Sequence, residues 1–253
     1  MAIKTILVSQ VRPEGEKSPY FDLAEKYDLK IDFRPFIHVQ GATAQEVRAQ
    51  RVNFADYTAV IMTSKVAVDH YFRVAEEMRF NVPDSMKYFC ISEAVALYLQ
   101  KYVIYRKRKI FFGTQTIEDV AAVMKKHKNE KFLLPCTDIL RDKIPEVLEN
   151  AGYTFKKAVL YRTAASDLSD LEDVYYDILV FFSPAGIESL FKNFPDFKQN
   201  NTVIATFGPT TANAAIKNNL RVDISAPQPN MPSMTAALEH YIKEVLKKEK
   251  SKK

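Results

Sequence analysis

Small hydroxyl residues that follow buried apolar runs are the feature of this sequence most suggestive of chemistry. Ser64 ends the run from Tyr57, Ser183 ends the run from Tyr176, and Gly208 to Thr211 follow the run from Val203 to Phe207. Apolar residues at helical spacing come next, which predicts a strand, a turn and a helix. Helix N-termini carry unpaired N–H donors and therefore suit carboxylates or phosphates. Serine is also an ordinary N-cap, so from the residues alone capping and anion binding both stay open.

Other catalytic patterns are missing from the sequence. It contains neither GxxxxGK[ST] nor GxGxxG, so nothing points to nucleotide binding. The four histidines lack ligand spacing, and we expect each to be a packing or surface residue. Cys90 and Cys136 form no CxxC pattern, so we expect reduced thiols and neither a disulfide framework nor a metal knuckle. Cys136 follows a predicted strand and is expected to be a small buried residue.

Charge and hydropathy narrow the class of protein. The chain has 253 residues and a net charge of +5, most of which comes from the lysine-rich segment 247–253. Basic residues are not interleaved with stacking aromatics, so we expect no nucleic-acid partner. No apolar run approaches the roughly 18 residues of a membrane span. The apolar stretch near the N-terminus is too short for a signal sequence, and a cytoplasmic protein is expected.

The sequence repeats itself at long range. Segment 57–72 resembles 176–191 at an offset of 119, segment 88–94 resembles 205–211 at 117, and segment 23–37 resembles 147–161 at 124. A period this long indicates a duplicated domain, because solenoid repeats are about 20–50 residues long. Two copies of one α/β unit predict two lobes with a cleft between them.

Strand and helix patterns alternate along the whole chain, which predicts an α/β fold with parallel sheets covered on both faces. The expected strands are 6–9, 31–37, 59–63, 88–91, 110–112, 132–135, 155–161, 178–182, 203–207 and 222–225. The expected helices are 20–27, 66–78, 93–100, 117–126, 144–150, 185–193, 211–218 and 233–246.

Several short motifs, in this order and spacing, resemble the uroporphyrinogen-III synthase family. They are Phe182-Ser183-Pro184-Ala185-Gly186, Gly208-Pro209-Thr210-Thr211-Ala212, Leu160-Tyr161-Arg162-Thr163, and the stretch from Leu134-Pro135-Cys136 through Arg141 to Gly152. The resemblance covers nearly the whole chain, including Arg12-Pro13 and Thr63-Ser64. Each motif is only moderately specific, whereas their combined order is much more so.

The resemblance implies two similar flavodoxin-like lobes joined by a two-stranded linker. Lobe one would be 1–36 with 165–253, lobe two 39–162, and the linkers about 36–39 and 162–165. The implied reaction belongs to porphyrin and haem biosynthesis. It is a lyase step that closes hydroxymethylbilane to uroporphyrinogen III, with loss of water and inversion of the terminal pyrrole through a spiro intermediate. No metal or cofactor is implied, the substrate is a linear tetrapyrrole octacarboxylate, and the protein is expected to be a monomer.

The same resemblance implies roles for particular residues. Tyr161 would be the catalytic acid that assists loss of the substrate hydroxyl. The residues expected to bind substrate, largely through backbone N–H groups, are Arg12, Thr63, Ser64, Lys65, Ser92, Ser183, Pro184, Ala185, Gly186, Thr210 and Thr211. One departure from the family is Ile91-Ser92-Glu93-Ala94, interpreted as the first-copy counterpart of Gly208-Pro209-Thr210-Thr211, because Glu93 adds a negative charge near a proposed anion site.

Two other functions are compatible with the predicted fold. A non-catalytic two-lobed protein that binds an anionic metabolite would explain Glu93, although it leaves Tyr161 and both second-copy motifs without a purpose. A module resembling a response regulator would need an acidic pocket at the strand ends. The strand ends here carry serine and threonine instead, which favours the enzyme.

Overall fold

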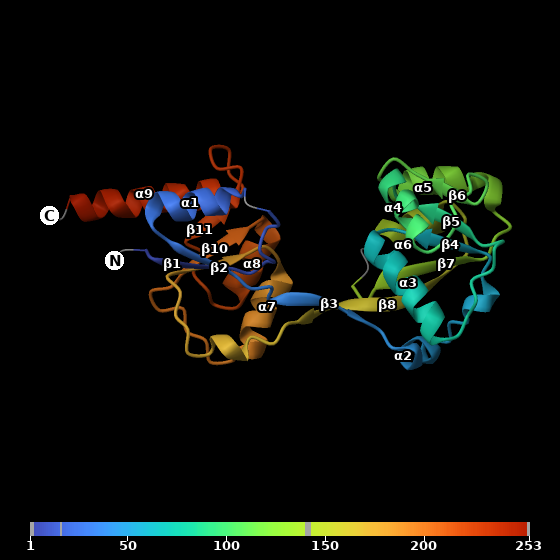
Figure 1. Cartoon of the computed structure of the whole chain (residues 1–253), viewed down its shortest axis with the longest axis horizontal. Coiled ribbons are helices and arrows are strands. Elements are labelled where there is room, and N and C mark those ends of the chain that lie inside the picture. Colours follow the sequence, from blue (N-terminus) through green and yellow to red (C-terminus); the bar gives the residue numbers. More distant parts are fainter. Residues whose placement is uncertain (1–2, 16, 140–142, 252–253) are drawn as a thin grey trace. The chain divides into compact units, whose positions relative to one another are not determined.

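The computed structural model describes residues 3–15, 17–139 and 143–251, which fold into two compact units (Figure 1). The terminal unit is Met1–His38 with Ala164–Lys253, and the central unit is Val39–Thr163. The chain passes between the units twice, within β3 (Ile37–Gly41) and within β8 (Phe155–Ala165). Among the described residues, no helix is long and apolar enough to cross a membrane.

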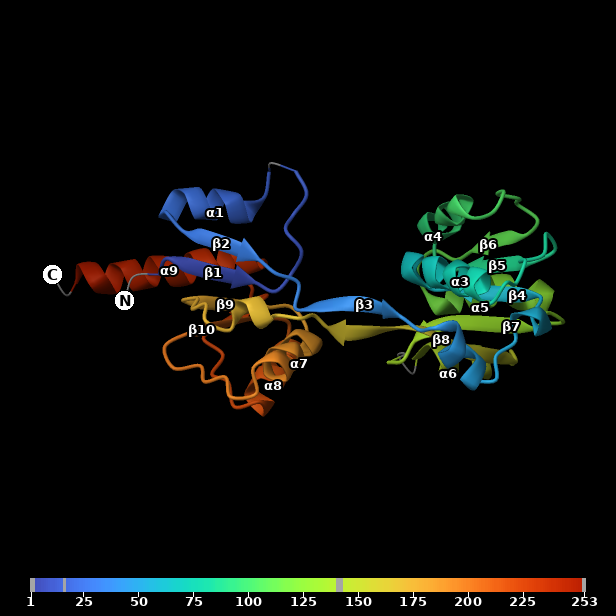
Figure 2. The same cartoon turned by 60° about the horizontal axis from the view of Figure 1, so that its bottom comes forward.

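The terminal unit is built on a five-stranded parallel sheet in the order β11-β10-β9-β1-β2. Figure 2 shows α1 on one side of this sheet and α7 and α8 on the other, while α9 packs with α1. The strands are β1 (Thr5–Val8), β2 (Lys30–Phe33), β9 (Ile178–Phe181), β10 (Val203–Phe207) and β11 (Ile224–Ala226). The helices are α1 (Pro19–Tyr27), α7 (Pro184–Asn193), α8 (Pro209–Lys217) and α9 (Met234–Lys250).

The central unit is built on a six-stranded sheet in the order β3-β8-β7-β4-β5-β6, in which β4 to β8 pair in parallel. One face packs against the segment that contains α2, α3 and α4, and the other against α5 and α6. The remaining strands are β4 (Ala59–Met62), β5 (Lys87–Cys90), β6 (Ile110–Phe112) and β7 (Phe132–Thr137). The helices are α2 (Ala44–Ala49), α3 (Lys65–Glu77), α4 (Glu93–Tyr98), α5 (Ile117–Met124) and α6 (Lys143–Asn150).

Both sheets follow one topology. In the terminal unit the strands, counted along the chain, lie in the order 2-1-3-4-5, which is the order of flavodoxin. The central unit has the same order in β8-β7-β4-β5-β6, if β7 and β8 are counted as strands 1 and 2 and β4, β5 and β6 as strands 3, 4 and 5. The terminal sheet therefore takes two strands from the first half of the chain and three from the second, whereas the central sheet takes four from the first half, including β3, and two from the second. The predicted α/β fold, with parallel sheets flanked by helices, is confirmed.

Three details of the sequence prediction were wrong. The expected strand 31–37 is two strands, because Pro35, between β2 and β3, cannot donate a ladder hydrogen bond. The short helix α2 was not expected. The offset of 117 is one residue too long. Cys90 pairs with Met62 in the central sheet as Thr206 pairs with Phe181 in the terminal sheet. Met62 and Phe181 are 119 residues apart, whereas Cys90 and Thr206 are 116 apart. Ser92 is therefore the counterpart of Gly208, and both are N-caps.

Phe54 anchors the core of the central unit on its α3 face. Its side chain is 1% exposed, and its ring stacks on Tyr71 of α3 with centroids 5.0 Å apart. It also meets the ring of Phe80 edge-on at 6.0 Å. Phe54 belongs to the connection between β3 and β4, so a single ring of this connection fills the space between α3 and the sheet.

We predict that Phe54→Ala lowers the free energy of unfolding of the central unit by about 3–5 kcal/mol, because it leaves a cavity in a packed core. Urea denaturation with hydrogen exchange of the α3 amides measures this loss. The control is Val174→Ala, since Val174 is 47% exposed and such a change should stay within about 0.5 kcal/mol. Equal effects of the two substitutions would contradict the anchoring role of Phe54.

Candidate functional site

The residues that the sequence singles out lie at the carboxyl ends of the strands in both units. In open parallel sheets ligands bind at this edge, where the strand order reverses. The reversal lies between β1 and β9 in the terminal unit and between β7 and β4 in the central unit. We call the two places the terminal site, which comprises Ser9, Arg12, Ser183–Gly186 and Gly208–Thr211, and the central site, which comprises Thr63–Lys65, His70, Ser92 and Tyr161.

Two serine hydroxyls meet at the start of α7 in the terminal site. Ser183 is the N-cap, and its Oγ accepts a hydrogen bond from the Gly186 N–H at 3.2 Å. A Cβ placed on Gly186 would lie 3.6 Å from the Ser183 Oγ and 3.8 Å from the Ser9 Oγ. Because Pro184 has no N–H, Ala185 is the residue of the first turn whose amide is left for a ligand.

The start of α8 has no capping side chain. Its N-cap is Gly208, whose φ of 87° suits glycine and which cannot accept a hydrogen bond through a side chain. Pro209 follows, so the amides of Thr210 and Thr211 are the first donors of the helix. The Thr210 side chain is exposed, whereas that of Thr211 is 1% exposed and offers a ligand only its backbone amide.

Two arginines bring positive charge to this edge of the terminal unit. Arg12, in the loop after β1, is exposed, and its guanidinium lies 5.1 Å from the ring centroid of Phe21. Arg34 follows β2 and was missed by the sequence analysis. It donates to the Asp167 carbonyl at 3.0 Å and to the Asp170 carboxylate at 2.8 Å. Its buried Nε has no acceptor among the described residues.

Tyr161 lies at the centre of the central site. It belongs to β8, where it pairs with Thr137 of β7. Burial raises the pKa of Tyr161, and a side-chain hydrogen bond with Ser64 partly offsets this rise. Tyr161 therefore keeps its proton at neutral pH. Ser64 is the N-cap of α3 and accepts from the Ala67 N–H at 3.0 Å.

His70 of α3 packs against the face of the Tyr161 ring. The two rings stack with centroids 5.1 Å apart and planes 20° from parallel. Arg73 Nε donates to His70 Nδ1 at 3.1 Å, which leaves the imidazole proton on Nε2. Burial, and after it the charge of Arg73, lowers the pKa of His70, so the imidazole is neutral at neutral pH. The sequence offered no signal for this pair, because contact between α3 and β8 is tertiary.

The backbone on the N-terminal side of Tyr161 is fixed by two side chains. Arg73 Nη2 donates to the carbonyls of Ala42 at 2.7 Å and Leu160 at 3.3 Å. The Gln50 amide donates to the Val159 carbonyl at 2.9 Å and accepts from the Val159 N–H at 2.8 Å. Tyr161 is therefore positioned by bonds to the two residues that precede it.

The other predicted residues of the central site are partly or fully exposed to solvent. Thr63 is half-buried, and Lys65 is exposed with its ammonium 5.4 Å from the ring centroid of Tyr98. Ser92 is the N-cap of α4 but makes no side-chain capping bond. Glu93, the next residue, is exposed at the first position of α4. Arg141 lies outside the described residues.

The chemistry available at these two edges is anion binding and proton donation. Hydroxyls and helix N-termini can hold carboxylates, and a protonated tyrosine can donate. Burial raises the pKa of Cys90 to about 12 and of Cys136 to about 11, so neither thiol is a nucleophile at neutral pH. The described part of the chain contains no group of three His, Cys, Asp or Glu residues suited to a metal ion.

We predict that Arg73→Ala raises the pKa of His70, because it removes a neighbouring positive charge. Long-range proton–nitrogen NMR spectra should show the Nε2–H tautomer in the unsubstituted protein and a loss of this preference in the variant. Arg79→Ala is the control, since its residue lies beyond the end of α3. An unchanged His70 titration in Arg73→Ala would contradict the contact.

Comparison with known proteins identifies the family. The model of the family described as "Uroporphyrinogen-III synthase HemD" matches residues 18–236. The chain is 22% identical over 257 aligned residues to uroporphyrinogen-III synthase of Chlorobaculum parvum, covering 95% of this chain and 100% of that protein. It is 27% identical over 139 residues to the Saccharomyces cerevisiae uroporphyrinogen-III synthase, covering 49% of this chain and only 50% of the yeast protein.

The fold is also similar to that of a solved structure. The crystal structure of uroporphyrinogen-III synthetase from Helicobacter pylori aligns with a TM-score of 0.56 and 18% identity, over 95% of this chain and 99% of that one. This likeness supports the α/β fold, while the family match covers most of the sequence. The chain belongs to the uroporphyrinogen-III synthase family.

Proposed function

We propose that this protein is a uroporphyrinogen-III synthase, a lyase that closes hydroxymethylbilane to uroporphyrinogen III with loss of water and inversion of the terminal pyrrole. The observation that carries the proposal is the family match over residues 18–236. The relatives that carry this name synthesise uroporphyrinogen III, as the name states. The chemistry of the two sites is compatible with it.

In this proposal each site binds some of the eight substrate carboxylates. The terminal site contributes the amides of Ala185, Thr210 and Thr211 together with Arg12. The central site contributes the start of α3 and the Lys65 ammonium. Binding through amides fits the modest net charge of +5, because helix N-termini attract anions without adding basic side chains. Salt should weaken binding by screening the exposed charges.

Tyr161 is the proposed acid. Its hydroxyl donates a proton to the departing hydroxyl of the substrate as the C–O bond breaks, so that water leaves and the electron-rich pyrrole carries the positive charge. The substituted carbon of the terminal pyrrole then attacks this centre, which gives the spiro intermediate. The bond from this carbon to its original methylene bridge then breaks, and the unsubstituted α-carbon of the same ring attacks the methylene that is released. The proton lost from that α-carbon as aromaticity is restored returns to the tyrosinate. The raised pKa of Tyr161 keeps the donor protonated before the step.

His70 and the bonds to Val159 and Leu160 position this acid. The stacked imidazole restricts rotation of the Tyr161 ring, and the two side chains that bind β8 restrict its backbone. Because hydroxymethylbilane also closes spontaneously, the enzyme's main task is orientation rather than strong acid catalysis. Few catalytic groups are therefore needed.

We also propose that the terminal and central units act as the two lobes of the enzyme, with linkers at about 36–39 and 162–165. The proposal supposes a cytoplasmic monomer that needs no metal or cofactor. In support, the residues of each site come from a single unit of one chain.

The proposal predicts a change in the product formed from hydroxymethylbilane. The bilane is generated in situ with and without this protein, and the oxidised porphyrins are separated by isomer. Uncontrolled closure gives isomer I, whereas the enzyme should give isomer III, with or without a chelator. If isomer I remains the sole product with folded protein in excess, the protein is a non-catalytic binding protein instead.

We predict that Tyr161→Phe lowers the rate of isomer III formation about ten- to a thousandfold, because a leaving group that departs unaided needs only part of the usual help from a general acid. The control is Tyr153→Phe, which removes a buried hydroxyl that donates to the Ala121 carbonyl at 2.7 Å on the other face of the same sheet. Rates of isomer III and melting temperatures are measured for both variants. A full rate in Tyr161→Phe would exclude its hydroxyl from the reaction.

A further inference from the structure

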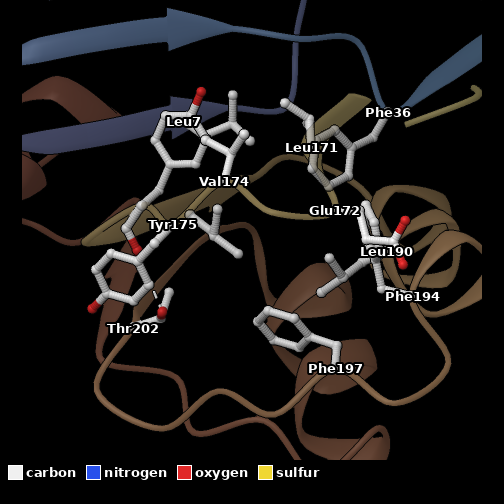
Figure 3. Close-up of a pocket in the computed structure, with 12 residues that line it drawn as sticks. Leu7, Phe36, Leu171, Glu172, Val174, Tyr175, Leu190, Phe194, Phe197 and Thr202 are labelled. Atoms are coloured by element: carbon white, nitrogen blue, oxygen red, sulfur yellow. Dashed lines mark hydrogen bonds between the residues drawn. The ribbon is translucent and has the colours of Figure 1, made fainter. Parts of the chain in front are cut away.

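A cavity of about 220 Å³ lies in the terminal unit, on the face of the sheet covered by α7 and beneath segment 166–177 (Figure 3). Its wall is mainly apolar and includes Leu7, Leu179, Leu190 and Phe197. It does not include any residue assigned above to the terminal site. The proposed function leaves this cavity without a role.

The corresponding space in the central unit can be located from equivalent residues of the two units. Leu190 and Tyr71 each stand seven residues after the N-cap of their helix, so they are counterparts in α7 and α3. Phe197 and Phe80 both follow the ends of these helices. The rings of Tyr71 and Phe80 both pack against the ring of Phe54. The equivalent of the cavity is therefore occupied by a phenyl ring in the central unit.

In the terminal unit the corresponding connection lines the cavity. The connection that leads into β9 is segment 166–177, which corresponds to the connection that carries Phe54 into β4. It offers Val174 and Tyr175 at the rim of the cavity, where they are 47% and 52% exposed. The side chains drawn in Figure 3 surround a gap rather than fill it.

The size and polarity of the cavity specify its ligand. An engineered cavity of about 150 Å³ with a comparable apolar lining binds benzene in another protein. The Thr202 hydroxyl already donates to the Tyr176 carbonyl, and the Tyr176 hydroxyl to Asp32. Among the described residues of the wall, Glu172 is the one with a charge. A cation beside a ring would therefore be favoured over an anion.

We propose that this cavity is a binding site for a small arylalkylamine, with a phenyl-sized ring in the apolar space and its ammonium group near Glu172. The ring takes the place that Phe54 occupies in the central unit. Binding of the ligand would also restrict the motion of segment 166–177. The start of this segment is already hydrogen-bonded to Asn193 at the end of α7, through the Ser166 carbonyl and the Leu168 N–H.

The test uses the full chain and three probes of similar size, namely phenethylamine, 2-phenylethanol and 3-phenylpropionate. Methyl NMR spectra and calorimetry measure binding, with the methyl groups of Leu179 and Leu190 as reporters. Leu238, on the opposite face of the sheet, is the control reporter. We expect phenethylamine to bind with at least fivefold higher affinity than the alcohol, and the carboxylate to bind most weakly.

Two substitutions test the parts of the site separately. Leu179→Phe enlarges a side chain of the cavity wall whose counterpart in the central unit, Val60, is small, and should weaken phenethylamine at least tenfold by filling the space. Glu172→Gln should remove the preference for the amine over the alcohol. Asp173→Asn, which changes the neighbouring carboxylate outside the cavity wall, should leave that preference unchanged.

Three results would overturn the proposal. They are no perturbation of Leu179 and Leu190 by any probe, equal affinity for all three probes, or binding only after Tyr175→Ala. The last result would mean that Tyr175 closes the cavity by itself. These measurements do not depend on tetrapyrrole turnover, so a failure here leaves the proposed function untouched.

Discussion

Both sheets depend on a pair of parallel strands that come from opposite halves of the chain. In the terminal unit Leu7 of β1 pairs beside Leu179 of β9, and in the central unit Val60 of β4 pairs beside Leu133 of β7. Neither half of the chain contains a complete sheet. The loop-closure entropy of these distant pairings must be overcome before either core can form. The apolar burial on both faces of each sheet offsets that cost.

The same pairings create the candidate sites. They set the ends of β1 and β9 side by side, so Ser9 and Ser183 approach Gly186 together. In the central unit the pairing of β4 with β7 brings the start of α3, which follows β4, toward β7 and β8. Tyr161 and His70 stack for this reason, although they are far apart in the sequence.

The two copies of the fold differ in the connections that enter their third strand. In the central unit the connection carries α2 and Phe54, and the space below α3 is packed. In the terminal unit segment 166–177 leaves a cavity. Its ends are nevertheless held by hydrogen bonds, because Asn193 donates to the Ser166 carbonyl at 2.9 Å and the Asp177 N–H donates to the Thr5 hydroxyl at 3.0 Å. The two units therefore differ in the side chains that fill this space, while the ends of segment 166–177 remain hydrogen-bonded to the rest of the terminal unit.

Local pattern in the sequence determined the alternation of strands and helices, the class of fold and the turns with Ser64, Ser183 and Gly208, because apolar periodicity and capping residues act over a few neighbours. Tertiary structure alone decided which strands pair, and with them the one-residue correction that matches Ser92 to Gly208. It also decided that His70 lies against Tyr161 and that the terminal unit has a cavity where the central unit has Phe54. These features depend on contacts between distant segments, which no local periodicity encodes.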